Sequence, residues 1–176
     1  MPTPAKTQFD FGPGLAKPGY EAYSNWTATG EMLISLVIDG KENLFEMTDF
    51  KVIYHNKQPY FFLEASTHIG GDLRFQLHGG SRQKLESGKR YILTPNHKDD
   101  GAEALFQSST IGATNGHTDM LGVLEVHNFL ETDNEVNITG NFYLKFEIFR
   151  FDMTKSSIFV EAHHFDVRAV RKSPTE

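Results

Sequence analysis

Histidines and carboxylates in two long loops are the residues of this chain best suited to metal or acid–base chemistry. The first loop carries His97, Asp99 and Asp100, and the second carries His117 and Asp119. A run that is expected to be extended, about eight residues long, separates the loops, and a strand of that length spans roughly 26 Å. We therefore expect the loops to lie at opposite ends of a sheet, which argues against one metal site built from both.

Turn carboxylates offer a second route to a metal site, because Ca²⁺ binds oxygen ligands that several loops contribute. If the strands alternate strictly in direction, Asp39, Asp99, Asp100 and Asp133 collect at one end of the sheet and Asp152 at the other. Asp99, Asp100 and Asp133 are our candidate Ca²⁺ ligands. Their spacing matches no known calcium loop, so solvated turn carboxylates are the alternative interpretation, and we predict no obligatory cofactor.

Three histidines on predicted strands, His127, His163 and His164, are candidate zinc ligands, since imidazole binds zinc well. His127 and His163 are expected to point outward from neighbouring strands, and plain solvent-facing histidines are the alternative interpretation. The chain contains no cysteine. Disulfides, thiolate zinc sites and cysteine nucleophiles are therefore excluded.

Motifs of covalent or phosphoryl chemistry are missing from the sequence. It has neither a Gly-x-Ser-x-Gly elbow nor the Lys-Ser/Thr of a phosphate-binding loop. Strand carboxylates such as Glu125 and Glu161 could work as a catalytic pair only if the fold brings two of them together. We therefore expect a protein that is not an enzyme, and keep an enzyme with a His/carboxylate site in a sheet concavity as an alternative.

The elements that must position these residues are strands. Residues 120–170 alternate apolar and polar side chains, which is the pattern of half-buried strands. Asp39-Gly40 and Asp133-Asn134 suit the positive φ of tight hairpin turns. The predicted strands are 31–38, 44–54, 60–67, 72–78, 89–94, 102–109, 120–130, 136–151 and 158–170. About nine antiparallel strands in one domain favour an all-β, two-sheet sandwich or jelly roll, with a flattened β-barrel as second choice.

Two irregularities interrupt the alternation. Gly140, inside the run 136–151, predicts a bulge or a bend at which the strand could cross between sheets. Near His163-His164 the apolar residues change parity, from Ile158, Val160 and Ala162 to Phe165, Val167 and Ala169. One extra residue there keeps both sets facing the core, so we predict a bulge, with a change of sheet as the alternative.

Aromatic residues on the polar side of the run 136–151 define a candidate binding face. Tyr143 and Phe149 share that side with Lys145, and exposed aromatic rings stack on sugars or pack against proteins. The predicted ligand-binding residues are Tyr143, Lys145, Phe149, His127 and His163. Residues 1–29 are rich in Pro, Gly and aromatic residues. We expect them to form an extended arm that packs on the body, covering this face, or reaches a neighbouring subunit.

Bulk properties limit the classes of function. The 176 residues fit one β domain, residues 30–172, that is large enough to bury a core. A net charge of −6 argues against binding nucleic acid or anionic membranes. Residues 1–10 lack the apolar segment of a signal peptide, and no run approaches the roughly 18 apolar residues of a membrane span. We expect a soluble protein, cytoplasmic or secreted, of bacterial character.

These observations favour a non-enzymatic binding or interaction module that recognises a carbohydrate or a protein through its loop rims or its outer aromatic face. A structural subunit of a larger assembly is the alternative. In that case the N-terminal arm would contact a neighbouring copy, and the protein would form a homo-oligomer.

Overall fold

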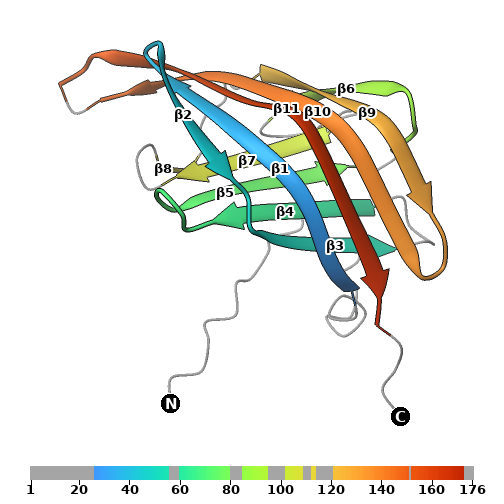
Figure 1. Ribbon diagram of the computed structural model, residues 1–176. Coiled ribbons are helices and arrows are strands. Elements are labelled where there is room, and N and C mark those ends of the chain that lie inside the picture. Colours follow the sequence, from blue (N-terminus) through green and yellow to red (C-terminus); the bar gives the residue numbers. More distant parts are fainter. Residues whose placement is uncertain are drawn as a thin grey trace.

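The computed structural model describes residues 26–55, 60–79, 85–94, 102–108, 112–113, 121–150 and 152–172. Within these ranges the chain forms eleven strands and no helix, which confirms the all-β prediction (Figure 1). The strands are β1 (Trp26–Ile38), β2 (Lys41–Glu46), β3 (Asp49–His55), β4 (Tyr60–Thr67), β5 (Leu73–Gly79), β6 (Lys89–Thr94), β7 (Ala102–Ser108), β8 (Gly112–Ala113), β9 (Leu121–Glu131), β10 (Glu135–Phe149) and β11 (Lys155–Arg171). None of the described residues belongs to a helix that could span a membrane.

The strands form one ladder that folds over into two layers (Figure 1). The larger layer has the order β2-β1-β11-β10-β9-β6, and all of its neighbours are antiparallel. In the smaller layer β5, β4 and β3 are antiparallel neighbours, while β7 pairs with β5 on one side and with the short β8. The layers are joined where β6 and β7 run parallel over two residue pairs.

The two-sheet sandwich that the sequence predicts is therefore confirmed. The outermost strands of the ladder are β2 and β3, and no backbone pairing joins them in the described part of the chain. The ladder stays open for that reason, so the second choice, a flattened barrel, is not the observed fold.

Alternation along the strands places one core between the layers. Every second residue of β10 from Val136 to Phe146 is buried, while the residues between them face outward. Phe75 of β5 stacks on Phe142 of β10 with the ring centroids 4.1 Å apart, which joins the two layers. Elsewhere, Tyr54 of β3 makes edge contacts with Trp26 and Phe129. Each fully buried aromatic side chain contributes about 1.5–3 kcal/mol through the apolar surface it removes from water.

The predicted bulge near His163-His164 is present in β11. β11 pairs with β1 along one edge and with β10 along the other. In both pairings the register shifts just before Phe165, because β11 has one residue more there than its partner strand. The extra residue restores the inward parity, so both apolar sets reach the core. All six of these side chains are at most 1% exposed: Ile158, Val160, Ala162, Phe165, Val167 and Ala169.

Gly140 behaves differently from the prediction. The register does shift beside it, but the extra residues belong to its neighbours: His127 in β9 and the His163-His164 bulge in β11. β10 itself keeps its alternation and stays in one layer, so the predicted bulge or crossing within this strand is wrong. A Cβ on Gly140 would lie less than 3.0 Å from the backbone oxygen of Glu125, so the close approach of the bulged β9 requires glycine here.

The structure also tests one predicted strand and two predicted turns. The predicted strand 44–54 is two strands, β2 and β3, with a break at residues 47–48 where the chain leaves the larger layer for the smaller. The Asp39-Gly40 turn has φ of 50° and 82°, as expected for a tight hairpin. The turn at Asp133-Asn134 is formed without positive φ. It is held instead by Thr132, whose Oγ1 accepts hydrogen bonds from the following backbone.

The predicted sorting of turns into two ends is wrong for Asp39. Its carboxylate accepts a hydrogen bond from Arg150 Nη2 at 2.7 Å, so Asp39 lies at the end of the β10–β11 hairpin and not beside Asp133. The parallel step from β6 to β7 interrupts the strict up-and-down alternation on which the sorting depended.

β1 already begins at Trp26, and residues 1–25 of the predicted arm lie outside the described residues.

Candidate functional site

The solvent-facing side of the larger layer, which we call the outer face, carries most of the large hydrophobic side chains that are exposed among the described residues. Ten large hydrophobic side chains are exposed among the described residues, and strand parity places eight of them on this face. The eight are Leu33, Leu44, Ile92, Leu121, Leu130, Tyr143, Phe149 and Val170. The other two, Ile69 and Met153, lie in turns.

An aromatic pair lies near the middle of the outer face. The Tyr143 ring of β10 packs against Phe159 of β11 with centroids 6.0 Å apart and an interplanar angle of 23°. Tyr143 remains 41% exposed, so a partner can reach one side of its ring. At the tip of the same hairpin, the Lys155 ammonium lies 5.3 Å from the ring centroid of Phe149. The face therefore offers aromatic surface together with fixed charge.

A hydrogen-bonded network borders this aromatic pair. Arg90 Nε of β6 donates to Glu125 Oε1 of β9 at 2.8 Å, and Asn141 Nδ2 of β10 donates to Glu125 Oε2 at 3.1 Å. Asn141 Nδ2 also lies 3.0 Å from His127 Nε2. The hydrogen bond from Arg90 is the main reason that the pKa of the Glu125 carboxyl lies below its ordinary value. Glu125 therefore stays ionised at neutral pH, which suits binding and not proton donation.

The predicted zinc arrangement is not formed. His127 lies in the bulge of β9 and His163 in the bulge of β11, and β10 runs between these strands. Two interstrand spacings separate their backbones by roughly 10 Å. His163 Nδ1 instead lies 3.2 Å from Glu161 Oε1. Within the described ranges, no three His, Asp or Glu side chains come close enough to hold a metal ion.

The calcium prediction is outside what the structure describes. Asp99 and Asp100 lie among the residues that are not described, and Asp133 is exposed in the β9–β10 turn. The prediction of a site shared by these three carboxylates therefore stays a prediction. The same holds for His97 and His117, whose loops are also outside the described residues.

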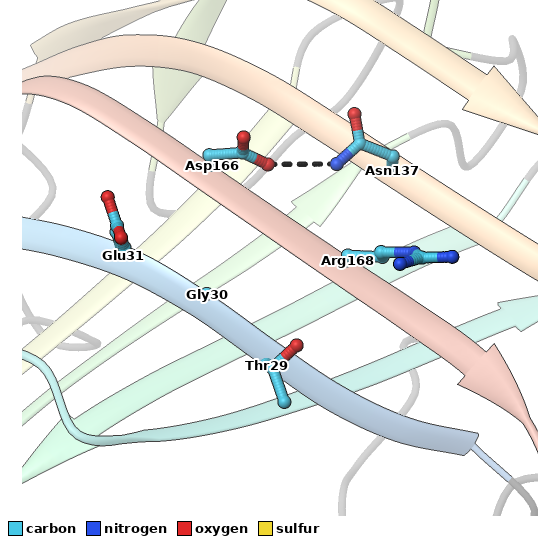
Figure 2. Close-up of a pocket in the computed structure, with 6 residues that line it drawn as sticks. All are labelled: Thr29, Gly30, Glu31, Asn137, Asp166 and Arg168. Atoms are coloured by element: carbon cyan, nitrogen blue, oxygen red, sulfur yellow. Dashed lines mark hydrogen bonds between the residues drawn. The ribbon is translucent and has the colours of Figure 1, made fainter.

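A polar hollow of about 420 Å³ opens on the outer face (Figure 2). β1 contributes Thr29, Gly30 and Glu31 to its lining, β10 contributes Asn137, and β11 contributes Asp166 and Arg168. Asn137 Nδ2 donates to Asp166 Oδ1 at 2.8 Å, the bond drawn in Figure 2. The guanidinium of Arg168 donates two hydrogen bonds to the Glu135 carboxylate of β10, of 2.7 and 3.0 Å.

Charge is unevenly distributed over the outer face. Among the described residues, strand parity places eight carboxylates there but only four Lys or Arg side chains. Three of the four cations form ion pairs on the face itself: Arg90 with Glu125, Lys155 with Glu147 and Arg168 with Glu135. The five other carboxylates, all on β2, β1 and β11, are Glu31, Glu42, Glu46, Glu161 and Asp166. These five carboxylates therefore gather over the β2-β1-β11 half of the face, and five of the eight exposed hydrophobic side chains lie on β10, β9 and β6.

The five residues predicted to bind a ligand all lie on the outer face. Tyr143, Lys145 and Phe149 come from β10, and His127 and His163 from the two bulges. The sequence predicted neither the hollow nor the role of Arg90 as the partner of Glu125. Both depend on which strands are neighbours in the sheet, and local pattern does not give the strand order. Alternation does place Glu31, Asp166 and Arg168 outward, and that was the available signal.

No family model, curated protein or solved structure matches this chain.

Proposed function

We propose that this protein is a non-enzymatic interaction module that binds another protein through the outer face of its larger layer. The observation that carries the proposal is that this face holds eight of the ten large hydrophobic side chains that are exposed in the described part of the chain. Exposed apolar surface gathered on one side of a small domain is typical of a protein-binding site, whereas scattered residues are not. The polar network and the ion pairs around this surface match the polar rim of such interfaces.

The size of the face suits this function. Five interstrand spacings make the layer about 24 Å wide, and the ten steps from Glu135 to Lys145 along β10 make it about 33 Å long. The resulting area of roughly 800 Å² equals what each partner buries in a standard protein–protein interface. A second copy of the chain is the less favourable occupant, because carboxylates outnumber cations eight to four on the described part of this face and two copies would bring together surfaces of the same net charge.

The experiment compares proteins captured from native cells by the tagged full chain and by two variants. Leu121→Ser with Ile92→Ser removes apolar surface from the outer face, and Ile69→Ser removes a similarly exposed side chain from a turn. We expect a partner that binds the native chain and Ile69→Ser and is lost with the double variant. Equal capture by all three chains, or no retained protein above background, would contradict the proposal.

A carbohydrate ligand is the second candidate, and the surroundings of Tyr143 favour it. An exposed ring beside an amide and a carboxylate that hold each other in place can stack on a sugar and bind its hydroxyl groups. A glycan array tests this function, with Tyr143→Ala and Asn141→Ala as variants that remove the ring and the amide separately. Binding that both variants weaken would favour a carbohydrate over a protein partner.

A further inference from the structure

We infer that the partner is basic: it presents Lys or Arg side chains beside apolar ones, and a cationic side chain enters the polar hollow on the outer face. The inference rests on the proposed function and adds the chemistry of the partner. Its basis is charge complementarity, because the β2-β1-β11 half of the face carries carboxylates that its own cations do not match.

The first observation is a pair of like charges directly across two strands. Glu31 of β1 is the register partner of Asp166 of β11, and both side chains lie on the exposed side of the sheet (Figure 2). Like charges in that arrangement destabilise a sheet. The nearest cation in the hollow is Arg168, and Glu135 already binds it through two hydrogen bonds. A cation supplied from outside would relieve the repulsion between Glu31 and Asp166.

The second observation is the shape of the hollow. Its volume of about 420 Å³ lies in the range that accommodates a small ligand or a protruding side chain. Gly30 contributes to it by having no side chain: a Cβ there would lie 2.6 Å from the backbone oxygen of Asp166, so β1 and β11 approach closely at this point. Asn137 fixes the Asp166 carboxylate by one oxygen. The hollow therefore presents a positioned carboxylate to an incoming ammonium or guanidinium group.

The apolar half of the face makes the partner amphipathic. Leu33 and Leu44 lie on two of the acidic strands, β1 and β2, and Leu121, Ile92 and Tyr143 lie on β9, β6 and β10 in the other half of the layer. A basic segment without apolar side chains would leave this surface exposed to water. A partner that alternates cationic and apolar residues covers both halves at once.

The test selects peptides from a random library displayed on phage, using the immobilised full chain as target, and measures the affinity of the selected peptides. We expect sequences enriched in Lys or Arg and in large apolar residues. Glu31→Gln with Asp166→Asn should weaken their binding by roughly tenfold. The control, Asp49→Asn, changes an exposed carboxylate of β3 in the smaller layer and should leave the affinity within twofold. Raising the salt concentration should weaken binding to the native chain more than to the double variant.

The outcomes separate this inference from the proposed function. Peptides that bind the outer face but lack Lys and Arg, or whose affinity Glu31→Gln with Asp166→Asn does not change, overturn the basic partner and leave the protein-binding function intact. Peptides whose binding is insensitive to both this variant and Leu121→Ser with Ile92→Ser overturn both proposals. A melting temperature of each variant that is no lower than that of the native chain shows that lost binding is not lost folding.

Discussion

Replacing Gly140 by alanine is expected to destabilise the fold, because β9 leaves no space for a side chain at that position. The added Cβ would lie less than 3.0 Å from the backbone oxygen of Glu125 and 3.2 Å from Cζ of Phe165. A flexible side chain could turn away, but the backbone of a bulged strand paired on both sides cannot move without disturbing its hydrogen bonds. Overpacking of a tight site costs about 1–3 kcal/mol, and the rigid neighbour places Gly140→Ala near 3 kcal/mol.

Urea denaturation followed by fluorescence measures this change as a lower midpoint with an unchanged slope. For a chain of this size, about 3 kcal/mol corresponds to a melting temperature lower by roughly 6–12 °C. The matched control is Gly40→Ala, where no atom lies within 4 Å of the new Cβ but φ is +82°. Backbone strain alone should cost about 1 kcal/mol there. A loss below about 0.5 kcal/mol for Gly140→Ala, or a larger loss for Gly40→Ala, would refute the steric argument.

Three further substitutions test separate parts of the structure. Phe142→Ala should lower the free energy of unfolding by about 3–5 kcal/mol in urea denaturation, because it empties the centre of the core; a loss under 1 kcal/mol would contradict that packing. The Asp39 carboxyl has a pKa held below its ordinary value, mainly by the hydrogen bond from Ser156. The stability it contributes is therefore present above the ordinary carboxyl pKa and lost as the pH falls through the lowered one. Asp39→Asn should destabilise the fold at pH 7, the destabilisation should shrink as the pH is lowered through the acid range, and an effect of the same size at every pH would refute this linkage. Arg90→Gln should raise the pKa of Glu125 toward its ordinary value in an NMR titration, and an unchanged value would show that Arg90 is not its main partner.

Much of the fold follows from local pattern in the sequence. Period-two alternation places Tyr143, Lys145 and Phe149 on one side of β10 without any knowledge of its neighbours. The change of parity near His163-His164 locates the bulge of β11, because only an extra residue keeps both apolar sets in the core. These features depend on which side chains are buried, and the alternation of apolar and polar residue types along a strand indicates that directly.

The candidate site is less accessible from the sequence because its contacts are not local. Arg90 and Glu125 are 35 residues apart and meet only because β6 pairs with β9. Glu31 and Asp166 face each other because β1, the first described strand, pairs with β11, the last. Alternation gives the face on which a residue lies, but strand order decides its neighbours. The prediction of a bulge within β10 at Gly140 was wrong for the same reason. The extra residues lie in the adjacent strands β9 and β11, which local pattern does not identify as neighbours of β10.

Site-specific photo-crosslinking in native cells tests the central claim, that the outer face of the larger layer binds a protein, most directly. A photoreactive amino acid replaces Leu121 on this face in one chain and Arg74, exposed on β5 of the smaller layer, in another. The proposal predicts a discrete adduct with another protein from position 121 and none from position 74. Adducts of equal yield from both positions, or from position 74 alone, would contradict it, and so would the absence of any adduct from position 121.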